Sequence, residues 1–294
     1  LHQKTLFGHP IGLFVLFFTE IWERFSYYGM RAILVYYLVA KTDDGENPGM
    51  GWLEVDALAL YGWYTMFVYL ATIPGGILAD RFLGQKKSVM LGGFLLCFGH
   101  GILAVEALWA FYTGLTFIVL GVGCLKGNIS TMVGGLYGKE DHNKRDMGFY
   151  IFYMGINLGA AASALLVGYV AEVGIDFQWL GFELKGWHDG FGLAGIGMAI
   201  GQFGYWRGQK YLTHVGNLIP LEKNENKKTD NLFLQIFKTT NSLIGFSVTA
   251  LLGIYLVYLG NWDYGLLLIG IAFAVGFAIV VYNDGNKIEK DRIL

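Results

Sequence analysis

The chain has 294 residues, of which 54% are hydrophobic and only 15% are charged, with a mean hydropathy of +0.46. Soluble domains carry about 25% charged residues, so this composition argues against an ordinary soluble enzyme. The net charge of -2 provides no basic field and gives no indication of a nucleic-acid partner. Glycine accounts for 43 residues and proline for only 4, which is typical of closely packed helices in a lipid bilayer.

Eight apolar segments are long enough to cross a membrane. A bilayer core about 30 Å thick requires roughly 20 predominantly apolar residues in a helix, and these segments are too long for membrane β-strands. In chain order they lie near residues 10–40, 56–79, 87–106, 108–135, 147–171, 187–206, 241–260 and 264–282. The sequence therefore predicts an all-α integral membrane protein.

The basic residues between these spans indicate an orientation. Of the 21 Lys and Arg residues, three lie inside spans, and only Lys41 and Lys185 fall on the outer side if the N-terminus is inside. The other 16 then lie in cytoplasmic connections, as the positive-inside rule requires. We therefore predict a multi-pass protein with a cytoplasmic N-terminus and a cytoplasmic linker at 207–240.

Five ionisable residues fall inside the predicted spans: Glu20, Glu23, Arg24, Arg31 and Lys126. Each unpaired charge costs roughly 2.5–3.5 kcal/mol at the bilayer centre, so such groups usually mark a functional site. A buried carboxylate beside a cation can exchange that partner for a proton, which predicts a proton-coupling switch. A structural ion-pair network that sets helix register is the alternative.

The spacing of these charges places them on one helix face. In the first span, residues at i, i+3, i+4, i+7, i+8 and i+11 are polar, and we expect them to line a cavity. They are Glu20, Glu23, Arg24, Tyr27, Tyr28 and Arg31. Lys126 lies in the middle of the fourth span between Gly123 and Gly127, where small residues permit close approach of neighbouring helices.

Four other polar residues within spans are ambiguous from the sequence. Asn157 has two equal interpretations, a hydrogen bond to substrate or a bridge between helices. Tyr64 and Tyr69 on the second span either line the cavity or pack between helices. His100, between two glycines, is expected to be a packed histidine with its hydrogen bonds satisfied, with a proton relay as the alternative.

Three motifs resemble one family. Residues 20–29 read EIWERFSYYG and match the E-x-x-E-R-F-x-Y-Y-G motif of the proton-dependent oligopeptide transporter (POT) family, a branch of the major facilitator superfamily. Residues 75–84 resemble the superfamily's cytoplasmic motif between spans two and three, and residues 149–159 resemble the family's signature in span five. The resemblance extends across essentially the whole chain.

This resemblance implies a domain plan. An N-terminal six-helix bundle occupies 1–206, the cytoplasmic linker 207–240, and an additional transmembrane hairpin, as in bacterial members, 241–282. Residues 283–294 would begin the connection to a C-terminal six-helix bundle of the same protein. We expect that bundle as a partner, because one bundle cannot alternate access by rocking against another. The implied location is the bacterial cytoplasmic (inner) membrane.

The resemblance also implies residue roles. Proton coupling would involve Glu20, Glu23, Arg24 and Lys126. Cations would hold the peptide's carboxylate, tyrosines its backbone and an asparagine its amino end: Arg31, Lys126, Tyr27, Tyr28, Tyr69 and Asn157. Asp80 and Arg81 would form a conformational latch, with a plain charged turn as the alternative. The histidine that animal members carry on span two is absent from residues 60–64, which leaves proton coupling to the carboxylates.

The predicted function is therefore proton-coupled symport of di- and tripeptides into the cell by alternating access. The coupling ion is H⁺, no cofactor or metal is expected, and the surrounding partner is the lipid bilayer. A non-transporting peptide receptor or scaffold, or a carrier of another small solute such as nitrate, is the alternative. An enzyme is disfavoured because the sequence shows no Ser-His-Asp arrangement, metal-ligand cluster or phosphate loop.

Overall fold

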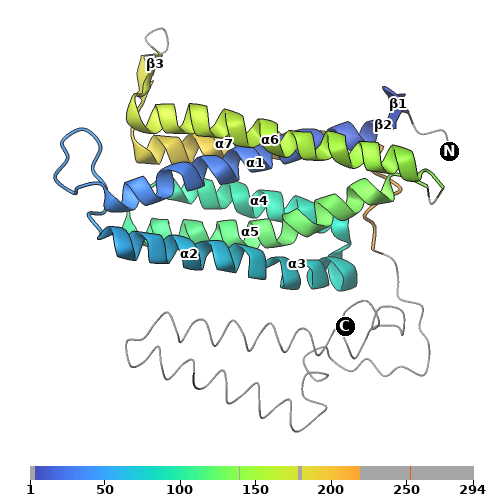
Figure 1. Cartoon of the computed structure of the whole chain (residues 1–294), viewed down its shortest axis with the longest axis horizontal. Coiled ribbons are helices and arrows are strands. Elements are labelled where there is room, and N and C mark those ends of the chain that lie inside the picture. The colour runs from blue at the N-terminus through green and yellow to red at the C-terminus, as the bar shows by residue number, and fades with distance from the viewer. Residues whose placement is uncertain (1–3, 139, 178–180, 219–251, 253–294) are drawn as a thin grey trace. The chain divides into compact units, whose positions relative to one another are not determined.

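The computed structural model describes residues 4–138, 140–177, 181–218 and Leu252 (Figure 1). The chain divides into two units, Leu1–Pro220 and Leu221–Leu294. The predicted hairpin at 241–282 and the segment 283–294 belong to the second unit and, apart from Leu252, lie outside the described residues. The following description concerns the first unit.

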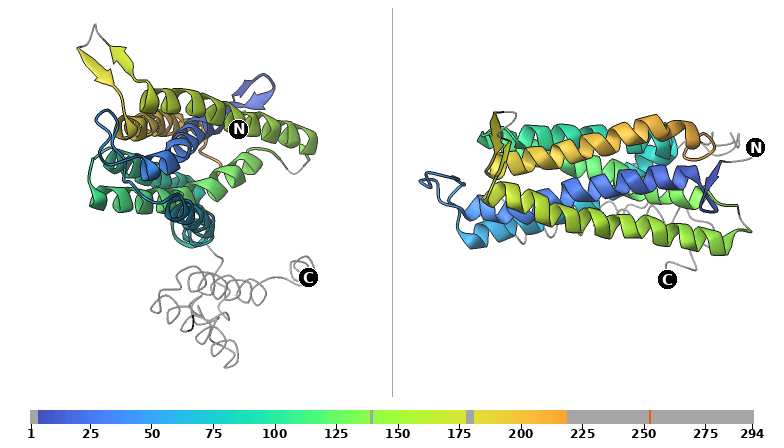
Figure 2. Two further views of the ribbon diagram at one scale, coloured as in Figure 1. Left: turned by 60° about the vertical axis from the view of Figure 1, so that its left-hand side comes forward. Right: turned by 90° about the horizontal axis from the view of Figure 1, so that it is seen from above.

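Long helices run side by side through the first unit, as Figure 2 shows from two further directions. Their bounds are α1 Ile11–Val39, α2 Glu54–Leu70, α3 Thr72–Leu78, α4 Gln85–Leu103, α5 Leu108–Gly135, α6 His142–Glu172 and α7 Trp187–Gly208. The first six predicted spans are thus helical. The main difference in bounds is the start of α6, which begins at His142 rather than near residue 147.

The second predicted span is helical from Glu54 to Leu83, as expected, but its regular α-helical hydrogen bonding is interrupted at Ala71. It comprises α2, α3 and a π-helical turn, η1, at Ala79–Leu83. Pro74 has no backbone N–H and cannot donate to the Leu70 carbonyl four residues earlier, and the helix breaks at Ala71. The signal for this break, a proline inside an apolar run, was present in the sequence.

Two short antiparallel hairpins in the connections were not predicted. β1 (Thr5–Leu6) pairs with β2 (His9–Pro10) before α1, and β3 (Ile175–Phe177) pairs with β4 (Phe182–Leu184) between α6 and α7. A 3-10 turn, η2 (Gln209–Tyr211), follows α7. These strands occupy the connections at the ends of the helices, and the described part of the bundle interior is entirely helical.

Facing glycines bring α4 and α5 into backbone contact. A Cβ added to Gly92 would lie 2.6 Å from the carbonyl oxygen of Gly121, and one added to Gly99 would lie 2.9 Å from that of Gly114. Both approaches are closer than a real Cβ tolerates. Small residues at a helix interface allow this packing in membranes, where dispersion contacts replace the hydrophobic effect as the driving force.

The two glycines that flank Lys126 on α5 differ from each other. A Cβ on Gly123 would lie 2.5 Å from the carbonyl oxygen of Ala71, at the break between α2 and α3, so Gly123 permits close approach as predicted. Gly127 has open space where its Cβ would be, and the same prediction was wrong for it. The side of α5 at Gly123 therefore packs tightly against the second span, whereas the side at Gly127 is open.

Three described segments are long and apolar enough to cross a membrane by length and composition: Glu54–Leu83, Leu108–Gly135 and His142–Glu172. α1 is long enough but too highly charged to be among them. Every stretch of 18 residues in α1 contains at least three of Glu20, Glu23, Arg24 and Arg31. Those charges, which lower its mean hydropathy, are the ones that the sequence singles out as functional.

Candidate functional site

Glu20, Glu23 and Arg24 form a buried charge cluster on α1, called the triad below. Their exposed fractions are 1%, 0% and 6%. The Arg24 Nε donates a hydrogen bond to Glu20 Oε1 at 2.7 Å and lies 3.0 Å from Glu23 Oε2. Neither oxygen of Glu23 accepts a hydrogen bond from the described residues. The triad thus holds two carboxylates around one guanidinium and is enclosed by protein.

Glycines of α6 make this enclosure possible. A Cβ on Gly159 would lie 2.9 Å from the Cβ of Arg24, and one on Gly155 would lie 2.9 Å from the ring of Phe17. Both glycines belong to the stretch 149–159 that carries the family resemblance. Their missing side chains let α6 pack directly over the triad, which keeps lipid away from its charges.

Arg31 lies two turns further along α1 and is held by aromatic rings. Its Nε donates a hydrogen bond to the Tyr61 hydroxyl at 2.9 Å, and its Nη2 donates to the same oxygen. The guanidinium carbon lies 5.3, 5.9 and 4.9 Å from the ring centroids of Tyr27, Tyr28 and Tyr61. No described carboxylate pairs with this half-buried cation. The rings stabilise its charge but do not neutralise it.

Lys126 reaches the same region from α5. Its Nζ lies 4.1 Å from the ring centroid of Tyr69 on α2, and among the described residues no carboxylate forms an ion pair with it. Tyr61 and Tyr69 both lie on α2, so this helix contacts both cations. Three helices therefore bring the triad, two unneutralised cations and several tyrosines into one neighbourhood.

Tyr61 is a site residue that the sequence analysis missed. In the stretch 60–64 the sequence analysis named only Tyr64 and the missing histidine, yet Tyr61 supplies the hydrogen-bond acceptor for Arg31. Tyr61, Tyr64 and Tyr69 follow the spacing i, i+3 and i+8, which places them on one face of α2. Tyr64 is 5% exposed, and its hydroxyl has no partner among the described residues. This spacing was the available signal.

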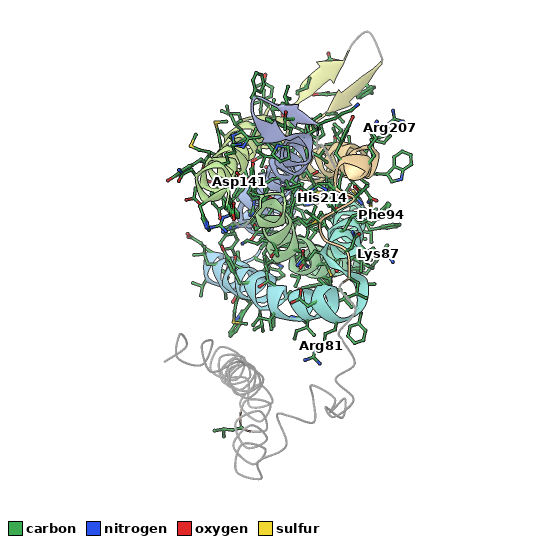
Figure 3. The ribbon with its side chains drawn as sticks, turned by 90° about the vertical axis from the view of Figure 1, so that its right-hand side faces the viewer. Arg81, Lys87, Phe94, Asp141, Arg207 and His214 are labelled. Atoms are coloured by element: carbon green, nitrogen blue, oxygen red, sulfur yellow. The ribbon has the colours of Figure 1, made fainter. Side chains whose placement is uncertain are left out.

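The remaining candidates are Asn157 on α6 and Asp80 and Arg81 in η1. Asn157 is exposed on α6, and no hydrogen bond of the described residues joins it to the triad or the tyrosines. Asp80 and Arg81 are exposed in the π-helical turn η1, and Figure 3 labels Arg81 at the lower edge of the bundle. The contacts among the described residues thus join candidates of α1, α2 and α5, while Asn157 lies two residues before Gly159, where α6 packs on α1.

His100 is fully buried where α4 meets α7. A Cβ on Gly195 would lie 3.1 Å from the Cβ of His100, and neither ring nitrogen has a hydrogen-bond partner among the described residues. The burial agrees with the packed histidine predicted from the sequence, but the described residues do not satisfy its ring nitrogens, as that prediction required. No group of three or more His, Cys, Asp or Glu side chains in the described residues is arranged to hold a metal ion.

Comparisons with known proteins agree with this architecture. A model of the POT family matches residues 86–260. A di-/tripeptide transporter of Lactococcus lactis subsp. cremoris is 40% identical over 299 residues, covering 99% of this chain and 56% of the relative. The peptide transporter YePEPT of Yersinia enterocolitica is 38% identical over 273 residues, covering 90% of this chain and 48% of the relative.

A solved structure is similar over the whole chain. The crystal structure of a peptide transporter POT in complex with sulfate aligns with a TM-score of 0.73 at 38% identity, covering 100% of this chain and 57% of the other. The chain thus spans about half the length of the curated relatives it matches. The family-model match begins at residue 86, the second residue of α4, and includes α5 to α7. The charge motif of α1 precedes it in the sequence. The chain belongs to the POT family of multi-pass membrane transporters, with the fold of the major facilitator superfamily.

Proposed function

We propose that the protein containing this chain is a proton-coupled symporter of di- and tripeptides. The observation that carries the proposal is the pair of cations, Arg31 and Lys126, that rest on tyrosine rings without a described carboxylate partner. Every peptide has a carboxylate end and backbone amides, whatever its side chains. A site that accepts many peptides must recognise these constant groups. The names of similar proteins, di-/tripeptide transporters, support the same substrate class.

In this proposal the two cations bind the peptide's carboxylate by charge-assisted hydrogen bonds. Tyr27, Tyr28 and Tyr69 contact the peptide backbone. The Tyr27 hydroxyl is buried and has no partner among the described residues, so it is available to donate or accept. Asn157, exposed on α6, is assigned to the amino end of the peptide.

Proton coupling is assigned to Glu20, Glu23, Arg24 and Lys126. Because two carboxylates share the single guanidinium of Arg24, one of them can take up a proton and leave the other paired. Protonation of Glu20 also removes an attraction on Lys126. The Lys126 ammonium then has more of its charge available for the peptide carboxylate. Proton uptake and peptide binding would thus favour each other, which is the linkage that a symporter requires.

The wider arrangement follows the same proposal. The cavity is completed by a C-terminal six-helix bundle, and access alternates as the two bundles rock about the site. Asp80 and Arg81 form the conformational latch at the cytoplasmic end, where the N-terminus also lies. The protein resides in the bacterial inner membrane, uses H⁺ as its coupling ion and no metal, and catalyses no chemical reaction on its substrate.

Uptake into liposomes tests the proposal. The complete protein should accumulate a labelled dipeptide under an inward proton gradient. Glu23→Gln should abolish this accumulation yet preserve exchange of dipeptide without a gradient, whereas Glu54→Gln, at the exposed start of α2, should change neither. Uptake that ignores the gradient would contradict proton coupling. Dipeptide binding without flux would identify a receptor, and transport of nitrate in place of peptides would overturn the substrate class.

A further inference from the structure

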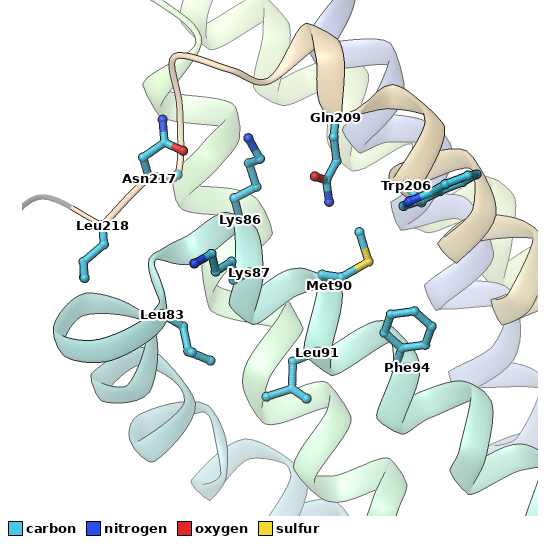
Figure 4. A pocket seen from close by; sticks show the side chains of 11 residues that line it. Leu83, Lys86, Lys87, Met90, Leu91, Phe94, Trp206, Gln209, Asn217 and Leu218 are labelled. Atoms are coloured by element: carbon cyan, nitrogen blue, oxygen red, sulfur yellow. The ribbon is translucent and has the colours of Figure 1, made fainter.

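A groove with a volume of about 720 Å³ lies between α4 and α7, and no triad residue lines it (Figure 4). It lies at the end of the bundle where α4 begins and α7 ends. The segment after α7 closes one side, because the backbone N–H of Lys86 donates to the Gly216 carbonyl at 2.8 Å. The Tyr205 hydroxyl donates to the Lys86 carbonyl at 3.0 Å. These two hydrogen bonds hold the backbone of Lys86 against the segment after α7 and against α7 itself.

The charge in this groove is positive and unneutralised. Lys86 and Lys87 both line it, and no Asp or Glu does. Neither lysine forms an ion pair with a described residue, and the first turn of α4 contains no acidic residue. Two lysines at the positive end of a helix dipole oppose that dipole, so an anion between them relieves an unfavourable arrangement. The groove therefore favours an anionic ligand.

The opposite end of the groove is apolar. Leu91 and Phe94 follow Lys87 at i+4 and i+7, so they share its helix face and extend about 10 Å along α4. They are 37% and 51% exposed, and Trp206 on the α7 wall is 59% exposed. Figure 4 shows the lysine side chains near Asn217 and Leu218, with Phe94 and Trp206 at the other end. One end of the groove thus suits a charged head, and the other suits hydrocarbon.

The surroundings of the groove indicate that a ligand with an anionic head and an apolar tail would be a membrane lipid. Large apolar side chains outside the groove, Phe98 and Phe203, continue the exposed faces of α4 and α7 at 64% and 62% exposure. In a membrane protein such faces contact acyl chains. Figure 3 places Lys87, Phe94 and Arg207 along the same side of the bundle. Tryptophan beside basic residues is typical of the membrane–water interface.

We propose that this groove binds one phospholipid with an anionic headgroup. The phosphate would lie on Lys86 and Lys87, and an acyl chain would follow Leu91 and Phe94. Positively charged clefts between helices near the cytoplasmic surface attract the anionic lipids of that leaflet. The groove contains none of the residues assigned to peptide or proton, so lipid binding and transport can be tested separately.

Native mass spectrometry of the complete, delipidated protein with added dioleoyl-phosphatidylglycerol tests the proposal. The unmodified protein should retain one phosphatidylglycerol in preference to dioleoyl-phosphatidylcholine. The double variant Lys86→Ala/Lys87→Ala should lower phosphatidylglycerol affinity at least tenfold, and Phe94→Ser should lower it by a smaller factor. Lys4→Ala/Lys144→Ala, which removes the same charge from exposed positions at the same end, should leave affinity unchanged.

Three results would overturn the proposal. The first is equal affinity for phosphatidylglycerol and phosphatidylcholine, because charge would then play no part. The second is an equal loss in the groove and control variants, which would indicate unspecific attraction to the basic end. The third is binding of inorganic phosphate that competes fully with phosphatidylglycerol and ignores Phe94→Ser, because the ligand would then be a free anion.

Discussion

The triad on α1 and the tyrosine-held cations beside it manage charge in opposite ways. Arg24 has its counterions within the same helix, at 2.7 and 3.0 Å, and all three triad side chains are buried. Arg31 and Lys126 come from different helices, lie on aromatic rings, and have no described carboxylate partner. The triad carries a formal charge of -1 if both its carboxylates are ionised, and the pair of cations carries +2.

This difference suits the two tasks proposed for the triad and for the two cations. A cluster with its own counterions is stable when the site is empty, and it responds to a proton because one carboxylate can be neutralised. A cation on aromatic rings is stabilised only partly, so it still gains free energy when an external carboxylate arrives. The comparison therefore predicts that triad variants affect stability and proton coupling, whereas variants of the two cations affect substrate binding.

The largest expected effect follows removal of the shared cation. Arg24→Ala leaves two buried carboxylates without their counterion, and we expect a loss of about 3–5 kcal/mol in folding stability. Thermal unfolding of the purified protein in detergent measures it. Arg31→Ala is the matched control and should cost far less, because Arg31 is half-buried and leaves no buried carboxylate behind.

A neutral triad sharpens that prediction. If orphaned carboxylates cause the loss, adding Glu20→Gln and Glu23→Gln to Arg24→Ala should restore much of the stability. A triple variant as unstable as Arg24→Ala alone would instead attribute the loss to the missing packing of the arginine stem, and the comparison of the two charge clusters would fail at this point.

The second prediction concerns the two cations. Arg31→Gln or Lys126→Gln should weaken dipeptide binding at least tenfold, because each removes a charge-assisted contact to the peptide carboxylate. Isothermal titration with a dipeptide measures the change. A dipeptide amide, which lacks that carboxylate, should bind the unmodified protein weakly and be insensitive to either substitution. Equal losses for peptide and amide would contradict the assignment.

Sequence periodicity was sufficient to find the charged face of α1, because the spacing of residues within one helix is independent of tertiary packing. It was insufficient across helices. Which residue of α2 contacts Arg31 depends on how α2 is rotated about its own axis. That rotation is set by packing between helices, such as the close contact of Gly123 with Ala71. Tyr61 was missed for this reason.

Lys126 teaches the same lesson. The sequence analysis paired it with the carboxylates of α1, but in the structure its nearest described partner is the ring of Tyr69. Tyr69 belongs to α2 and Lys126 to α5, so their contact depends on how these two helices pack. Hydrophobic patterning within one helix does not reveal such a contact.

A smaller effect is expected at Tyr61. Tyr61→Phe keeps the ring under Arg31 but removes the hydroxyl that accepts two of its hydrogen bonds. We expect dipeptide affinity to fall about fivefold, since the guanidinium loses its fixed orientation at a cost of about 1 kcal/mol. Tyr36→Phe, on the exposed side of α1, serves as the control for titration. An unchanged affinity would mean that the rings alone orient Arg31.

The smallest effect distinguishes ring from hydroxyl at Tyr69. The Lys126 ammonium lies over the face of this ring, so Tyr69→Phe keeps the contact and should change dipeptide affinity by less than about twofold. Tyr69→Leu removes the π-face and should weaken binding about two- to fivefold, as expected for an exposed cation–π contact. Titration of both variants decides between two roles. If Tyr69→Phe is the more damaging change, the hydroxyl contacts the peptide directly and the ring does not serve chiefly to position Lys126.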